Sequence, residues 1–168
     1  MRKTKLYAEA FFKNLTEDQK VLAYSQLKAL EDLMVQLKDY VSFLIHNPAE
    51  FSQVRSVVEG DYEPLTLNFL EVIIQDGMVN RLAAIIDDYK QILVNKGLLA
   101  NIQVTTARPL SEEARQVLEA EIESYWQGPK DYNYQVNPYY IEGIHLKIND
   151  AVIDTTYRSR LNQIIKEV

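Results

Sequence analysis

The sequence predicts an α+β protein, in which an N-terminal helical bundle of about six helices is followed by a small α+β C-terminal domain. Through most of residues 1–99, apolar residues recur every three or four positions, the period of amphipathic helices. Later segments instead alternate between apolar and polar residues, which is typical of strands. Because the period changes just after Gly97, we expect two domains, residues 1–99 and 100–168.

Composition favours an ordinary globular protein and disfavours several function classes. Of the 168 residues, 47% are hydrophobic and 25% are charged, which is enough apolar material to bury a core. The net charge of −6 argues against a nucleic-acid partner, because such proteins usually present a basic face. Cysteine is absent, which removes disulfides, thiolate metal sites and a cysteine nucleophile. No signal peptide or membrane span is expected, so any membrane association should be indirect, through partners.

The first helices are predicted from capping residues and from the spacing of apolar side chains. Residues 6–13 form a short helix on which Tyr7, Ala10 and Phe11 share a face. Thr16 and Gln19 have the spacing of a capping box and start a long helical pattern that reaches residue 45, with a break predicted near residues 38–39. Its apolar seam steps by four and three residues and is interpreted as bundle core. The seam consists of Ala23, Leu27, Leu30, Met34, Leu37, Val41 and Leu44.

Residues 65–77 are the most apolar stretch and are expected to form the central helix of the bundle. Pro64 precedes the stretch and Gly77 ends it, as is usual for helices. Apolar residues cover most of its sides, so other helices should surround it. Phe69 is assigned to the core, where truncation to alanine would cost roughly 3–5 kcal/mol. One strip is expected to reach the surface, and it consists of Asn68, Glu71, Val72 and Gln75.

The remaining elements follow from similar signals. Asn47-Pro48 starts a short helix with four apolar residues directed inward, namely Phe51, Val54, Val57 and Val58. Residues 79–93 form a further amphipathic helix. In the second domain, strands are predicted at 102–106, 132–136, 144–148 and 151–154, with a helix between Ser111 and residue 125. Asn149-Asp150 forms a two-residue turn, and residues 157–168 form a last amphipathic helix.

The residues show little sign of a catalytic, metal or cofactor site. His46 and His145 fall in different predicted domains, and a single histidine does not make a metal site. The acidic pairs lie on predicted helix surfaces or in first turns, where carboxylates are common. The tyrosine-rich segment 125–140 resembles a stacking platform for bases, but Lys130 is its only basic residue. We therefore expect neither an enzyme nor a cofactor, and the residues alone indicate a two-domain interaction protein.

Several short motifs, in order along the whole chain, resemble the delta subunit of F-type ATP synthase, also called the oligomycin-sensitivity-conferring protein. The opening Tyr-Ala-Glu-Ala-Phe-Phe at residues 7–12 is similar to that family's opening, and Asn47-Pro48 to its mid-bundle Asn-Pro. Asn-Phe-Leu at 68–70 followed by Asp76-Gly77 resembles its fifth helix. Val-Thr-Thr-Ala-Arg-Pro-Leu-Ser at 104–111 and residues 136–161 resemble its C-terminal motifs.

The resemblance implies a non-catalytic stator subunit on the cytoplasmic face of the cell membrane, attached through the ATP synthase complex. In that family the helical domain grips the N-terminal helix of an alpha subunit, and the C-terminal domain holds the b subunits of the peripheral stalk. The gripping surface lies between the first and fifth helices. It carries over to Tyr7, Ala10, Phe11, Asn68, Val72 and Gln75. Contacts with b are expected at Arg158, Arg160 and Leu161.

The sequence departs from the family pattern at three positions that could mark a diverged paralogue. Met78 replaces an arginine, Asn137 replaces an aspartate, and Glu142 replaces the first glycine of a turn. A paralogue serving another rotary complex is therefore an alternative. A nucleic-acid-binding module built on the small sheet is a further one, disfavoured by the acidic charge.

Overall fold

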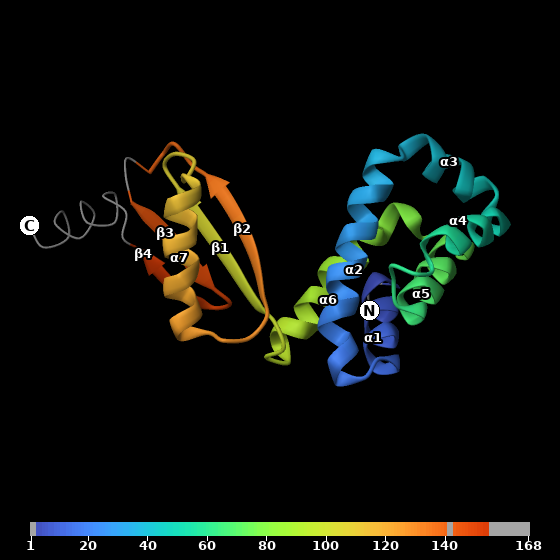
Figure 1. The fold of residues 1–168 in the computed structure, drawn as a ribbon, viewed down its shortest axis with the longest axis horizontal. Coiled ribbons are helices and arrows are strands. Elements are labelled where there is room, and N and C mark those ends of the chain that lie inside the picture. The colour runs from blue at the N-terminus through green and yellow to red at the C-terminus, as the bar shows by residue number, and fades with distance from the viewer. Residues whose placement is uncertain (1–2, 141–142, 155–168) are drawn as a thin grey trace, which may run out of the picture. The chain divides into compact units, whose positions relative to one another are not determined.

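The computed structural model describes residues 3–140 and 143–154, and the chain divides into two compact units, Met1–Lys96 and Gly97–Val168. The division falls at Gly97, which adopts a positive φ of 69° directly after a helix. Figure 1 shows that the first unit is helical and that the second contains the sheet. The predicted α+β class, with a helical bundle first and a small α+β unit second, is confirmed.

Six α-helices make up the described part of the first unit. They are α1 Lys3–Asn14, α2 Glu17–Gln36, α3 Lys38–His46, α4 Phe51–Val58, α5 Pro64–Gln75 and α6 Leu82–Asn95, with 3-10 turns η1 Pro48–Glu50 and η2 Val79–Arg81. The predicted break in the long helical pattern occurs at Leu37, between α2 and α3. None of the described helices is both long and apolar enough to cross a bilayer.

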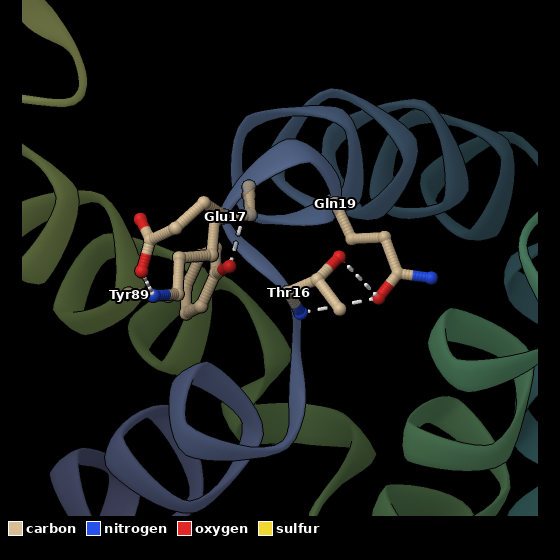
Figure 2. Close-up of polar contacts among 5 residues, drawn as sticks. Thr16, Glu17, Gln19 and Tyr89 are labelled. Carbon is tan, nitrogen blue, oxygen red and sulfur yellow. Dashed lines mark hydrogen bonds and ion pairs between the residues drawn. The ribbon is translucent and has the colours of Figure 1, made fainter.

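The start of α2 is fixed by its own cap and by a contact from α6. Gln19 Oε1 accepts hydrogen bonds from the Thr16 backbone N–H (3.2 Å) and the Thr16 hydroxyl (3.1 Å), so these two residues interact as the capping-box spacing predicts. Tyr89 of α6 donates its hydroxyl to the Lys20 carbonyl at 2.9 Å (Figure 2). The Tyr89 bond ties the first turn of α2 to α6, whereas the Thr16–Gln19 bonds are local to the cap.

The apolar seam of α2 and α3 is only partly buried. Ala23, Leu27, Leu30 and Leu44 lie in the core, as predicted. Leu37 is 47% exposed because the chain breaks there and the helical periodicity is interrupted. In α4, Phe51 is buried but Val57 is 80% exposed, so its predicted inward orientation is wrong. Val57 lies off the face defined by Phe51, Val54 and Val58, which are spaced i, i+3 and i+7.

The second unit is a four-stranded sheet with one described helix, and the strands occur where the sequence predicted them. They are β1 Ala100–Thr106, β2 Lys130–Val136, β3 Ile144–Ile148 and β4 Ala151–Asp154, in the order β2-β1-β3-β4. The β1 and β2 strands are parallel and are joined by α7 Glu112–Tyr125, whereas β1 with β3 and β3 with β4 are antiparallel. Asn149 adopts a positive φ of 51° in the turn between β3 and β4.

Strand alternation gives the sheet one apolar face and one polar face. Ile102, Val104 and Leu146 are buried and pack with Ile122 of α7. Gln103 and His145 alternate with them, on the other face. The polar placement predicted for His145 is therefore confirmed, and the described helix of this unit covers the apolar face.

The tyrosine-rich segment contributes to this small core. Tyr132 and Tyr134 of β2 stack with ring centroids 5.9 Å apart and pack against the buried cluster. The Tyr134 hydroxyl donates to Glu119 Oε1 at 2.5 Å, and the Arg115 guanidinium lies 4.8 Å from the Tyr134 ring centroid. These two tyrosines therefore support α7 on the sheet, whereas Tyr125 and Tyr139 are exposed.

Candidate functional site

The α1–α5 face is the surface formed by the exposed residues of α1 and α5 beside the line where these two helices meet. Phe11 of α1 and Phe69 of α5 stack with centroids 4.1 Å apart and an interplanar angle of 11°. One turn towards the start of α1, the Tyr7 hydroxyl donates to a carboxylate oxygen of Asp76, which caps the end of α5. Because residue 7 lies by residue 76 and residue 11 by residue 69, the two helices run in opposite directions.

The exposed strip predicted for the central helix is present on this face. Asn68, Val72 and Gln75 are exposed, with 45% of Val72 accessible, whereas the fourth predicted member, Glu71, is half-buried. On the opposite side of α5, Leu67, Leu70, Ile73 and Ile74 are buried at 3% exposure or less. Leu65 is 36% exposed and extends the strip towards the start of the helix. The strip therefore offers apolar and amide groups above a rigid, buried support.

The first helix supplies the other side of the face. Phe11 is buried, Tyr7 is half-buried, and Ala10 is exposed. The side chain of Ala10 is one methyl group, so the surface of α1 is low at this position and another helix could approach closely. The structure thus brings together Tyr7 and Phe11 with α5, while Ala10 lies on the outer surface beside them.

Electrostatics at one end of the face are governed by the Tyr7–Asp76 contact. The hydrogen bond to Asp76 raises the pKa of the Tyr7 hydroxyl above its usual value, and burial and the carboxylate charge act in the same direction. A phenol with a raised pKa stays protonated throughout the neutral range, so the bond persists there. It would be lost only when alkaline pH removes the phenolic proton.

Sequence reasoning missed a polar network that borders the strip. Arg55 Nη1 of α4 lies 2.8 Å from Glu71 Oε2, and Gln75 Nε2 donates to Glu71 Oε1 at 3.2 Å. Glu71 was identified as part of the strip, but its partner lies on a different helix, 16 residues earlier. Periodicity along one helix carries no information on such a pairing.

At two of the three positions where the sequence departs from the family pattern, the residue present makes a hydrogen bond that the family's usual residue could also make. Met78 donates its N–H to the Ile73 carbonyl at 2.8 Å, next to Gly77 with a φ of 65°, which is the glycine end of a helix. Asn137 Oδ1 accepts from the Tyr139 N–H at 3.1 Å, a bond that an aspartate oxygen could equally make. Glu142, Arg158, Arg160 and Leu161 lie outside the described residues.

Phe69 is only partly buried, and this changes the effect expected of its truncation. Its ring stacks on Phe11, but the side chain is half-buried rather than fully enclosed. We expect Phe69→Ala to lower the free energy of unfolding by about 3 kcal/mol, the low end for a core phenylalanine. Urea unfolding followed by far-ultraviolet circular dichroism measures this loss, and a change below about 1 kcal/mol would show that the stack contributes little.

Comparisons with known proteins identify the family. The model of the ATP synthase delta (OSCP) subunit family matches residues 4–168. ATP synthase subunit delta of Clostridium kluyveri is 24% identical over 165 residues, which cover 95% of this chain and 91% of that protein. The corresponding subunit of Syntrophomonas wolfei is 27% identical over 166 residues, which cover 96% of this chain and 91% of that protein.

The fold comparison agrees with the sequence comparison. A chain of the cryo-EM structure of the Toxoplasma gondii mitochondrial ATP synthase hexamer matches with a TM-score of 0.68 and 16% identity, covering 99% of this chain and 97% of that chain. At this identity the match is evidence of a shared fold. Since the family model spans both units, the chain belongs to the ATP synthase delta (OSCP) subunit family.

Proposed function

We propose that this chain is the non-catalytic stator subunit that links the catalytic head of an F-type ATP synthase to its peripheral stalk, so that proton-driven rotation is coupled to ATP synthesis. The helical unit would bind the N-terminal helix of an alpha subunit on the α1–α5 face. The second unit would hold the b subunits, with Arg158, Arg160 and Leu161 as proposed contacts. The complex would keep the chain at the cytoplasmic face of the cell membrane.

The observation that carries the head-binding proposal is the exposed strip on an otherwise buried helix. The α5 helix is apolar on most sides, yet Asn68, Val72 and Gln75 remain in solvent beside the low surface at Ala10. An amphipathic helix laid on this face would cover Val72 and satisfy the two amides. This is the helix-in-groove mode of peptide recognition. The Phe11–Phe69 stack beneath keeps the face in shape before the partner arrives.

Two features of the chain suit a mechanical connector. The family match extends across both units, and the proposal assigns a different partner to each of them. A joint loaded by rotary torque must dissociate slowly, and slow dissociation requires a preorganised, well-packed surface. A rigid aromatic stack with a tethered α1, held by Tyr7 and Asp76, meets that requirement.

Isothermal calorimetry of the full chain with a synthetic peptide tests the proposal. The peptide carries the N-terminal helix of the alpha subunit from the same organism, and a shuffled peptide of the same composition is the control. We expect one-to-one binding with a Kd below about 1 μM for the native peptide. The single tryptophan, Trp126, lies in the second unit, and its fluorescence serves to check that this unit stays folded. A folded chain that binds neither peptide would contradict the head-binding role.

A further inference from the structure

At the end of the α1–α5 face near Gln75 and Asp76, the Arg55–Glu71 pair fixes which hydrogen-bond acceptors are left exposed. An ionised carboxylate can only accept hydrogen bonds. Gln75 must therefore turn its NH2 group towards Glu71 Oε1, 3.2 Å away. This fixes the amide so that the Gln75 Oε1 atom is left as an acceptor at an exposed position. Arg55 fixes the other Glu71 oxygen at 2.8 Å and offsets its charge.

Asp76 adds charge to the same end. It is exposed, and it accepts the Tyr7 hydroxyl with one carboxylate oxygen. No cation in the described part of the chain forms an ion pair with it. Asp76 also follows the last turn of α5, where the helix dipole is negative. Gln75 and Asp76 thus present acceptors next to Val72, whereas Glu71 one turn away is already paired with Arg55.

We propose that this end of the face selects a partner helix by a lysine or arginine side chain that reaches the Asp76 carboxylate and Gln75 Oε1 while an apolar neighbour packs on Val72. The inference rests on the proposed binding of the alpha-subunit helix and adds the charge that this helix must carry. Arg55 is a positioning residue here. It holds Glu71, so that Gln75 keeps its orientation and the positive side chain is directed to Asp76.

The test compares two charge-neutralising variants of the full chain in the calorimetric titration. Asp76→Asn removes the charge but retains an oxygen that can accept the Tyr7 hydroxyl, so α1 stays attached. Asp61→Asn removes the same charge from an exposed turn before α5, at the opposite end of that helix from Asp76, and is the matched control. At 20 mM NaCl we expect Asp76→Asn to weaken binding about fivefold, and this difference to shrink with added salt as exposed charges are screened. Asp61→Asn should have wild-type affinity.

Peptide variants locate the partner group and separate the possible outcomes. Each lysine or arginine of the peptide is replaced in turn by glutamine. One of these peptides should bind the wild-type chain about fivefold more weakly than the native peptide does. The same peptide should bind Asp76→Asn as tightly as the native peptide does. Gln75→Leu is a second variant, expected to weaken binding without altering the salt dependence. Equal affinity of Asp76→Asn and Asp61→Asn at low salt would overturn this inference and leave head binding standing. Absence of wild-type binding would overturn both.

Discussion

Replacing Ala10 with tryptophan is expected to reduce the affinity of the chain for the alpha-subunit peptide by at least about a hundredfold, or roughly 2.7 kcal/mol. Ala10 is exposed on the α1–α5 face, where its single methyl group leaves the surface low. An indole there would occupy the volume in which the backbone of a docked helix should lie. The docked helix could then not reach Val72, and overpacking of this kind is not relieved by small shifts.

The stability of the chain should change little in this variant, because Ala10 does not contribute to the core. The loss of helix propensity from alanine to tryptophan is about 0.5 kcal/mol at an exposed position. Ala29→Trp, on an exposed position of α2, is the matched control and should bind the peptide as the wild type does. Calorimetry is the appropriate measurement, since the new tryptophan would alter fluorescence by itself. Undiminished binding by Ala10→Trp would place the docking surface elsewhere on the chain.

The elements of this fold could be predicted because their signals are local. The Thr16–Gln19 cap, the break at Leu37 and the Asn149 turn each depend on a few neighbouring residues, and all three occur within a residue or two of the predicted position. The exposed strip of α5 was predictable for a related reason. On an apolar helix, a polar line can be satisfied only by solvent or by a partner.

Contacts between elements were not predictable from the same signals. The Tyr7–Asp76 bond joins residues 69 positions apart, and the Arg55–Glu71 pair joins two helices. Both depend on how the helices pack, which periodicity along one helix does not determine. Val57 illustrates the same limit: an apolar residue near a buried face is buried only if another element covers it, and Val57 is 80% exposed. The candidate site was therefore predicted as a set of residues but not as a network.

The largest effect on stability is expected from Tyr89→Ala, which should lower the free energy of unfolding of the helical unit by about 4 kcal/mol. Tyr89 is fully buried and packs against Phe11 and Phe12, with ring centroids 5.4 and 6.2 Å away. Its hydroxyl also holds the Lys20 carbonyl at 2.9 Å (Figure 2). Burial raises the pKa of this hydroxyl, so it remains a donor at any pH near neutrality. Truncation therefore leaves a cavity beneath α1 and also removes a bond to α2.

Tyr89→Phe separates the two contributions, because it keeps the ring and removes only the hydroxyl. Its expected cost is about 1 kcal/mol, the usual value of one buried hydrogen bond. Urea unfolding followed by far-ultraviolet circular dichroism reports mainly the helical unit, whereas Trp126 fluorescence reports the second unit. Both variants should shift the unfolding transition followed by circular dichroism and leave the transition followed by Trp126 fluorescence in place. A Tyr89→Phe loss as large as that of Tyr89→Ala would mean that the bond to α2, rather than the packing against α1, holds this side of the bundle together. The α1–α5 face would then depend on α6 only indirectly.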